Sequence, residues 1–183
     1  MRVIAGKCRS MPLQTPPGKD TRPTTDRIKE TLFNILMPEI PGCRFLDLFA
    51  GSGGIGIEAL SRGADYCCFV ENNRNAAAVI RKNLAFTKLA DQAEVLQMDA
   101  LSAVSACAGK KPFDLVFLDP PYGCGLEAAV LQRLAASACI HPDTLFVLET
   151  ALQYDCEPVL QAGYRIVREK RYKTNQHLFL KRS

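Results

Sequence analysis

The sequence predicts an α/β fold with an open, mostly parallel sheet of seven strands, and three observations support this prediction. From Arg44 onward, short apolar runs alternate with helical segments, the order that produces parallel strands covered by helices. A glycine-rich turn follows the first apolar run, as at a strand-to-helix junction. Near the end of the chain, two strand-like segments have no helix between them, so the last strand is expected to run antiparallel.

A short arm and a helix precede the sheet. The 183 residues suffice for one domain. We expect residues 1–23 to form a basic arm or hairpin and residues 24–183 to form the domain. A helix begins at Thr24 or Thr25, whose hydroxyl can cap it, and its apolar residues recur at helical spacing up to Leu36.

The remaining elements alternate strand and helix in five units. The predicted strands are Arg44–Phe49, Tyr66–Val70, Ala93–Met98, Phe113–Leu118 and Thr144–Leu148, and the helices between them are Gly54–Arg62, Arg74–Lys88, Ala100–Ala108 and Leu126–Ala138. A short helix near Pro158 precedes the last two strands, Tyr164–Tyr172 and Gln176–Leu180.

Composition excludes several classes of protein. No apolar stretch approaches the ~18 residues that span a bilayer, and residues 1–20 lack a signal peptide's apolar block, so we expect a cytoplasmic protein without a membrane partner. The eight cysteines form no C-x-x-C pair, which predicts no metal site. Cys67 and Cys68 are expected in the core, and Cys124 is disfavoured as a nucleophile because only two histidines are available to activate it.

Positive charge gathers at the two ends of the chain. Residues 1–30 carry a net charge of +4 and residues 161–183 carry +6, while residues 31–160 carry −6. This distribution favours a polyanionic partner held by the ends over an ordinary solvated basic surface. The candidate phosphate contacts are Lys7, Arg9, Arg22, Arg27, Lys170, Arg171 and Lys173.

The first strand leads into a candidate cofactor site. Gly51, Gly53 and Gly56 satisfy G-x-G-x-x-G, and Glu71 ends the next strand, where an acid can bind ribose hydroxyls. These residues fit a dinucleotide or S-adenosylmethionine equally well. Asp47 favours S-adenosylmethionine, because its carboxylate would repel a pyrophosphate and attract an ammonium or sulfonium group.

Residues near these strand ends complete the predicted cofactor site. Asp99, at the end of the third strand, can accept the adenine amino hydrogen or cap the helix that follows, and the two roles are compatible. The other predicted cofactor-binding residues are Phe49, Ser52, Asn72 and Ala100.

The segment Asp119-Pro120-Pro121-Tyr122 predicts the catalytic site. It follows an apolar strand, and two consecutive prolines restrict its backbone to a rigid corner. A carboxylate, a carbonyl and an aromatic face at this corner suit a planar amine. We expect Asp119 and the Pro120 carbonyl to accept the amine's two N–H bonds while Tyr122 stacks on an extruded base, so that the pyramidal nitrogen can attack a methyl group.

These motifs together resemble a known family. The segments around Asp47, Gly51, Glu71 and Asp119, with Arg22-Pro23-Thr24-Thr25-Asp26-Arg27 and Glu30-Thr31-Leu32-Phe33-Asn34, are similar to the bacterial RsmD-type methyltransferases along nearly the whole chain. The resemblance implies a Rossmann-like class I fold dependent on S-adenosylmethionine. It also implies methylation of the exocyclic N2 of one guanine in small-subunit ribosomal RNA, with partly assembled subunits as the expected partner.

The chain departs from the family pattern at two places, the arm and the position after Glu71, and other activities stay open. In the arm, Cys8 replaces an aromatic residue, and the family's further glycine or basic residues near Ser10 and Met11 are missing. Asn73 replaces an acid after Glu71. DNA adenine N6 and a protein glutamine amide present a similar planar amine, and only the arm and the segment 22–34 disfavour them. An NAD-dependent oxidoreductase would leave Asp47 and the proline corner unexplained, and a non-catalytic RNA-binding module would have no use for a methyl-donor site.

Overall fold

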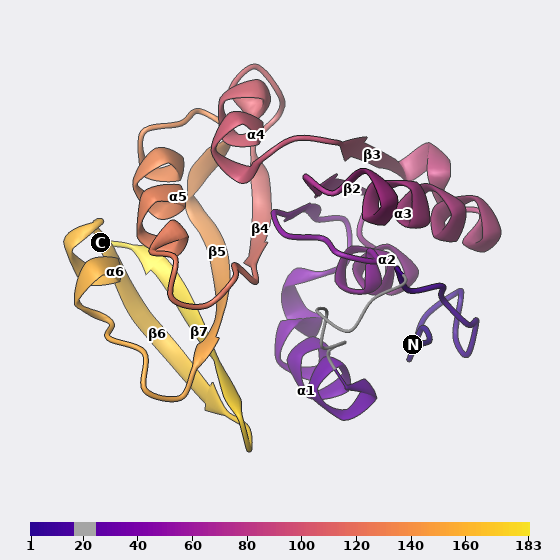
Figure 1. Cartoon of the computed structure of the whole chain (residues 1–183), viewed down its shortest axis with the longest axis horizontal. Helices are drawn as coiled ribbons and strands as arrows, with labels where there is room; N and C mark the ends of the chain where they lie inside the picture. Colours follow the sequence, from indigo (N-terminus) through magenta and orange to yellow (C-terminus); the bar gives the residue numbers. More distant parts are fainter. Residues whose placement is uncertain (17–24) are drawn as a thin grey trace.

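The computed structural model describes residues 1–16 and 25–183 and contains one seven-stranded sheet (Figure 1). The strands are β1 (Arg44–Asp47), β2 (Tyr66–Val70), β3 (Ala93–Leu96), β4 (Phe113–Leu118), β5 (Ile140–Ala151), β6 (Tyr164–Arg171) and β7 (Asn175–Arg182). Their order is β3-β2-β1-β4-β5-β7-β6, and β7 runs antiparallel to both of its neighbours. The predicted α/β sheet with an antiparallel last strand is confirmed.

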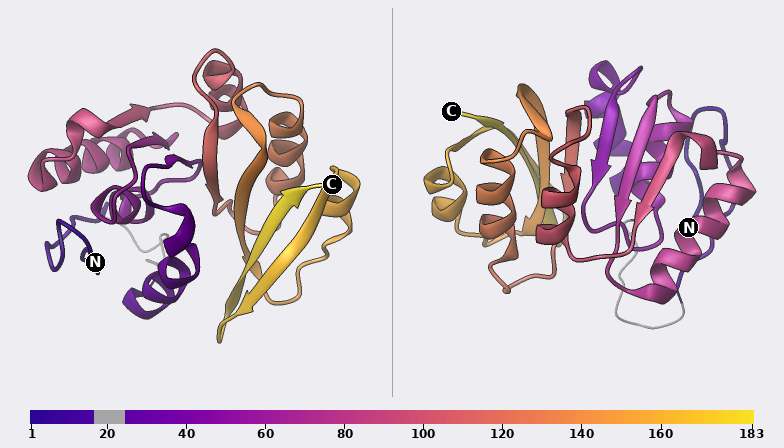
Figure 2. Two further views of the ribbon diagram at one scale, coloured as in Figure 1. Left: turned by 180° about the vertical axis from the view of Figure 1, so that it is seen from behind. Right: turned by 90° about the horizontal axis from the view of Figure 1, so that it is seen from above.

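Helices cover both faces of the sheet (Figures 1 and 2). They are α1 (Asp26–Leu36), α2 (Gly54–Ser61), α3 (Arg74–Thr87), α4 (Ala100–Cys107), α5 (Leu126–Ala135) and α6 (Glu157–Gln161), with 3-10 turns at Met37–Glu39 and Ala90–Gln92. The helices α1 to α3 share one apolar core with the arm, and α4 to α6 form the other core.

Alternation along the central strands divides side chains between the two cores. Phe45 packs with α1 to α3, and its neighbour Leu46 packs with α4 to α6. Cys67 and Cys68 point to opposite faces in the same way and are fully buried, as predicted. The fold therefore has three layers, with the sheet between two layers of helices and an apolar core on each of its faces.

Several strands differ in length from their predictions: β3 ends at Leu96 instead of Met98, β6 ends at Arg171 instead of Tyr172, β7 is longer than Gln176–Leu180, and β1 and β5 also differ. β1 ends at Asp47, two residues earlier than expected, because the chain turns there to begin the glycine-rich loop. β5 starts at Ile140 and ends at Ala151, so it is much longer than predicted. The polar residues His141 and Asp143 concealed its first half, where the pairing with β4 is irregular.

The N-terminal arm folds back on the helices as a loop. Val3 N–H donates to Met11 O at 3.0 Å and Leu13 N–H donates to Met1 O at 3.0 Å, but the predicted hairpin is only a single antiparallel bridge between Arg2 and Pro12. Cys8 is buried and donates to the carbonyl of Thr87 in α3. Cys8, which departs from the family pattern, therefore packs the arm against α3.

Glu58 of α2 binds the N-terminal arm through hydrogen bonds to its backbone. Its fully buried carboxylate accepts the backbone N–H groups of Ile4 at 2.8 Å and Ala5 at 3.0 Å. The arm also has backbone hydrogen bonds of its own, such as Ser10 N–H to Val3 O at 2.9 Å, and the charge-assisted bonds to Glu58 fix its position against α2.

Among residues 1–16 and 25–183, none of the helices combines the length and apolar character that a membrane-spanning helix needs.

Candidate active site

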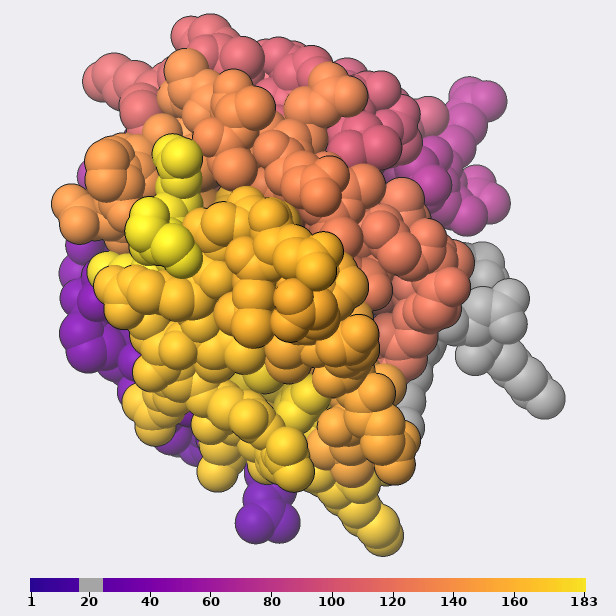
Figure 3. Space-filling view, turned by 90° about the vertical axis from the view of Figure 1, so that its left-hand side faces the viewer, coloured from indigo at the N-terminus to yellow at the C-terminus, as the bar shows by residue number. Residues whose placement is uncertain are grey.

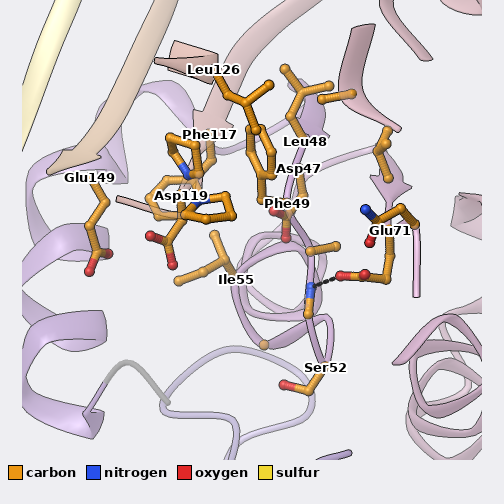
Figure 4. A pocket seen from close by; sticks show the side chains of 18 of the residues that line it. Asp47, Leu48, Phe49, Ser52, Ile55, Glu71, Phe117, Asp119, Leu126 and Glu149 are labelled. Carbon is orange, nitrogen blue, oxygen red and sulfur yellow. Dashed lines mark hydrogen bonds between the residues drawn. The ribbon is translucent and has the colours of Figure 1, made fainter. Parts of the chain in front are cut away.

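A cavity of about 530 Å³ opens at the carboxyl ends of the parallel strands. Strand order reverses between β1 and β4, and the chain leaves these two strands on opposite faces of the sheet. Such a switch point opens a crevice in which α/β proteins bind ligands. The cavity lies at this point and extends to residues of α1 and β7 (Figure 4).

Acidic residues mark the carboxyl ends of all five parallel strands that precede β6. These residues all line the cavity and are Asp47, Glu71, Asp99, Asp119 and Glu149. Figure 4 shows Glu149 and Asp119 in one half of the cavity, Asp47 in the middle and Glu71 in the other half. The cavity therefore favours ligands that present cationic or hydrogen-bond-donating groups.

The glycine-rich turn is held against the end of β2. The Gly51 N–H donates to Glu71 Oε2 at 2.9 Å (Figure 4), and the Asn73 N–H donates to Glu71 Oε1 at 2.8 Å. Gly51 has a φ of +54°, and a Cβ there would meet no atom within 4 Å. Each Glu71 oxygen keeps an acceptor site for a ligand hydroxyl.

Gly53 was predicted to bind the cofactor, but it does not line the cavity. It begins α2 with a φ of +81°, and a Cβ there would contact Ile57 and Ile80 at 3.3 Å. Gly53 therefore faces the core and does not line the cavity. It shapes the turn through its left-handed backbone, a conformation that glycine adopts most easily.

Asp47 carries a buried acceptor in the middle of the cavity. Its Oδ2 accepts the Gly56 N–H at 3.1 Å, while Oδ1 has no hydrogen-bond partner within the described residues. Burial raises the pKa of Asp47 to about 7, although the N–H groups of Gly56 and Phe49 oppose this rise. An unsatisfied buried oxygen fits a ligand that brings a cation or a donor.

The other predicted cofactor residues also line the cavity, namely Phe49, Ser52, Asn72, Asp99 and Ala100. Asp99 caps α4, because its Oδ1 accepts the Ser102 N–H at 2.9 Å and its Oδ2 accepts the Ser102 hydroxyl at 2.6 Å. Asp99 thus caps α4, as one of its two predicted roles requires, and it also lines the cavity. Asn73, the second departure from the family pattern, caps α3.

The proline corner follows β4 directly and turns into the cavity. All four of its residues, Asp119, Pro120, Pro121 and Tyr122, line the cavity, and Tyr122 is 53% exposed. Burial, together with the nearby charges of Glu149 and Asp47, raises the pKa of Asp119 to about 8. The negative charge of the Asp119 carboxylate is thus destabilised until a ligand brings a hydrogen-bond donor to it.

Glu149 was absent from the predicted site and belongs to a buried polar network. Asn175 Nδ2 donates to Glu149 Oε1 at 2.5 Å, and His177 Nε2 lies 3.0 Å from Glu149 Oε2. The Tyr172 hydroxyl lies 3.1 Å from the other ring nitrogen of His177. The sequence carried one signal for Glu149: it follows the apolar run Leu145–Leu148, just as Asp119 follows the run of β4.

Further cavity residues also escaped the sequence analysis. They come from the arm, α1 and the hairpin of β6 and β7, and they include Met1, Thr15, Ile28, Lys29 and Thr174. These segments lie far from the motifs in the chain, so only the folded topology brings them to the site. The described residues hold no group of three or more Cys, His, Asp or Glu side chains arranged to bind a metal ion.

Some of the predicted phosphate contacts flank the cavity. Arg27 is exposed on α1 beside Ile28 and Lys29, which line the cavity, and Lys173 is exposed beside Thr174. Lys170 lines a second groove with Arg168 of β6 and with four residues of α1 and the turn after it, Thr31, Asn34, Ile35 and Pro38. Figure 3 shows the face that β6, α5 and α6 build, with α1 emerging at its edge.

Other predicted phosphate contacts do not reach the cavity. Lys7 Nζ donates to Gln92 Oε1 at 2.6 Å, at the amino end of β3 and thus at the opposite edge of the sheet, and Arg9 is exposed in the same turn. Arg171 is exposed and forms an ion pair with Glu169. Arg22 lies outside the described residues.

The sheet order, the reversed β7 and the cavity beyond β1 and β4 define the Rossmann-like fold of class I methyltransferases. Residues 1–181 match the family described as "Conserved hypothetical protein 95". The chain belongs to this family, and the predicted resemblance to the RsmD-type methyltransferases is confirmed.

Individual relatives resemble the chain over most of its length. It is 47% identical to "Putative rRNA methyltransferase YlbH" of Bacillus subtilis over 150 residues, 81% of this chain and 82% of the relative. It is 37% identical to "Ribosomal RNA small subunit methyltransferase D" of Haemophilus influenzae, covering 93% and 88% of the two chains. The solved structure of "Putative methyltransferase yhhF from Escherichia coli" superposes with a TM-score of 0.86 at 35% identity, covering 100% and 98%.

Proposed function

We propose that this protein transfers a methyl group from S-adenosylmethionine to the exocyclic N2 amine of a guanine in small-subunit ribosomal RNA. One observation carries the proposal: a single cavity holds Glu71 in one half, where it can accept ribose hydroxyls, and Asp119 in the other, where it can accept an amine (Figure 4). The unsatisfied Asp47 Oδ1 lies between the two halves, where a cationic group would compensate it.

The residues around Asp47 fit the methyl donor. Asp47 would pair with its positive end, Glu71 would accept its ribose hydroxyls, and Asp99 would accept the adenine amine. Gly51 leaves open space beside the turn, so that the backbone can approach the ligand closely. When bound, S-adenosylmethionine supplies an electrophilic methyl group to the amine nitrogen.

The proline corner prepares the amine. An aromatic amine is a weak nucleophile because its lone pair is delocalised into the ring. Asp119 and the Pro120 carbonyl would accept its two N–H bonds, which favours a pyramidal nitrogen and stabilises its developing positive charge. Tyr122 would stack on the extruded base, and Asp119 or bulk water would take up the released proton.

The proposal of RNA as the substrate draws on the relatives and on charge. The names of the Bacillus subtilis and Haemophilus influenzae relatives specify ribosomal RNA, and the second of them also specifies the small subunit. Arg27, Lys170 and Lys173 flank the cavity mouth or the neighbouring groove, where they can contact phosphates. A partly assembled small subunit is the substrate that we propose.

Asp119→Ala tests the chemical step. The variant should lose methyl transfer to small-subunit RNA by about 1000-fold or more, as with removal of a group that stabilises transition-state charge. Binding of S-adenosylmethionine, measured by calorimetry, should change little. Asp143→Asn, an exposed change on β5, serves as the control. Unchanged turnover in Asp119→Ala would refute the role of the corner.

A second measurement tests the chemical identity of the product. Small-subunit RNA from cells that lack the protein should be deficient in one N2-methylguanine when its digest is compared by mass spectrometry with that of the parent strain. Supplying the wild-type protein should restore the modified nucleoside, and the Asp119→Ala variant should not. A deficit in methyladenine instead would favour the alternative of an adenine N6 substrate.

A further inference from the structure

Asp119 directly follows β4, and Glu149 lies at the same level near the carboxyl end of β5, the neighbouring parallel strand. Leu118 of β4 pairs with Leu148 of β5 in the sheet register, so the residues that follow lie one strand spacing apart, about 4.8 Å. Both side chains line the cavity and point into the same half of it (Figure 4). A planar ligand held at Asp119 therefore has Glu149 beside it.

The network behind Glu149 makes it a fixed acceptor. Asn175 and His177 contact one oxygen each, and Glu149 is only 7% exposed. A carboxylate accepts only, so His177 Nε2 carries the proton, and in the neutral ring Nδ1 accepts from Tyr172. Each carboxylate oxygen keeps lone pairs for a ligand, so Glu149 can receive an N–H from the cavity and cannot donate one.

The planar amines that can reach the corner differ in the group beside the NH2. Guanine places a ring donor, N1–H, next to its N2 amine on the same edge. Adenine and cytosine place a ring nitrogen acceptor next to theirs, and a glutamine amide places a carbonyl oxygen there. A second acceptor beside Asp119 matches guanine and repels the other three.

We propose that Glu149 is a specificity-determining residue, whose carboxylate accepts the N1–H of the target guanine while Asp119 and the Pro120 carbonyl hold its amine. The inference rests on the proposed function and adds the reason why guanine is selected. Asn175 and His177 act as positioning residues, because each of them contacts one oxygen of Glu149. A buried acceptor left without its N–H disfavours a wrong base.

The test exchanges one base. The methylated guanine is first mapped by mass spectrometry and then replaced by 2-aminopurine, which keeps the 2-amino group and lacks the N1–H. Small subunits reconstituted with either RNA are methylated with radiolabelled S-adenosylmethionine. Wild-type protein should prefer guanine in kcat/KM by about 100-fold or more. In Glu149→Gln this preference should fall at least tenfold, since one acceptor oxygen becomes an NH2 donor and the remaining amide oxygen is a weaker acceptor than a carboxylate.

The comparison separates a specific role from a structural one. 2-Aminopurine also lacks O6, but this loss affects wild type and variant alike, so the change in preference reports the N1–H. Glu157→Gln, the same substitution on the exposed surface of α6, should retain the full preference. A Glu149→Gln variant that slows both bases equally would overturn the proposal and leave Glu149 a structural role.

The wild-type measurement stands even where the variant does not fold. Equal methylation of guanine and 2-aminopurine by the wild-type protein overturns the proposal without any substitution. Failure of the proposed function has a different signature, which is the absence of methyl transfer to guanine in the first place. The two failures are thus distinguishable in one set of assays.

Discussion

The ammonium group of Lys29 in α1 lies 3.2 Å from Glu58 Oε2 in α2, and neither side chain is more than 1% exposed. Arg62 Nε contacts the other oxygen, Oε1, at 2.8 Å, and Lys29 also donates to the carbonyl of Arg2 at 2.5 Å. Glu58 thus receives two cations and two backbone N–H groups of the arm. One carboxylate joins α1, α2 and the arm beneath the cavity.

Removing the charge of Glu58 should destabilise the protein. Glu58→Gln leaves Lys29 and Arg62 without their counter-charge, and breaking a buried pair in this way costs about 3–5 kcal/mol. Urea unfolding followed by circular dichroism measures the change. Arg171→Gln breaks the exposed pair with Glu169 and should cost less than about 1 kcal/mol. Equal losses in the two variants would contradict the role assigned to Glu58.

The stability of the protein should decrease with pH because of Asp119. Its pKa is about 8 in the folded state and 3.8 in the unfolded state, so between these values the folded protein holds a proton that the unfolded chain releases. Stability therefore falls as pH rises through this window. Asp119→Asn lacks the titration and should melt at least about 3 °C above wild type at pH 8.

The difference between Asp119→Asn and wild type should shrink towards pH 4, where the carboxyl of the wild type is protonated. Differential scanning calorimetry across the pH range provides the measurement. Asp143→Asn makes the same substitution at an exposed position of β5 and should follow wild type at every pH. A melting difference independent of pH would point to packing instead of charge.

Glu71 should control affinity for S-adenosylmethionine. Glu71→Gln replaces the oxygen that accepts either the Gly51 or the Asn73 N–H with a donor, and it weakens the acceptor for ribose. Loss of one such bond costs about 1–3 kcal/mol, or roughly a 5- to 150-fold rise in Kd. Calorimetry measures the affinity, with the exposed Glu39→Gln as control. An unchanged Kd would exclude Glu71 from the cofactor site.

Gly56 should tolerate no side chain. A Cβ at this position would overlap the Phe69 ring and approach Cys67 Sγ to 2.6 Å, behind the glycine-rich turn. Gly56→Ala should therefore lower the free energy of unfolding by about 1–3 kcal/mol. Gly109→Ala, where a Cβ meets nothing within 4 Å, should be close to neutral in the same urea titration. A larger loss of stability in Gly109→Ala than in Gly56→Ala would show that Phe69 and Cys67 of β2 move aside easily.

The two basic ends of the chain should differ in their contribution to RNA binding. Lys170→Gln removes a charge from the groove between β6 and α1, and it should weaken binding and reduce the salt dependence by about one ion. Lys7 lies at the opposite edge of the sheet, so Lys7→Gln should have a smaller effect. Filter binding at several salt concentrations compares the two variants, and equal effects would extend the RNA footprint across the sheet.

Local pattern predicted the strand sequence and the cavity residues that follow strands, because a strand end and its turn are encoded within a few residues. Asp47, Glu71 and Asp119 were identified in this way. Glu149 was missed although it follows an apolar run as Asp119 does, and His177 was missed because its place opposite Glu149 depends on the antiparallel pairing of β5 with β7. Lys7 was predicted as a phosphate contact from its charge alone, but the arm places it at the opposite edge of the sheet from the cavity.

The position of β7 between β5 and β6 also bears on the order in which the protein folds. β7 follows every other strand in the chain, yet Asn175 and His177 are the residues that hold Glu149. During synthesis the first five strands and their helices leave the ribosome before β7 does, so β7 can join the sheet only after they have emerged. The wall of the cavity at Glu149 is therefore completed last, after the strands that carry Asp47, Glu71 and Asp119.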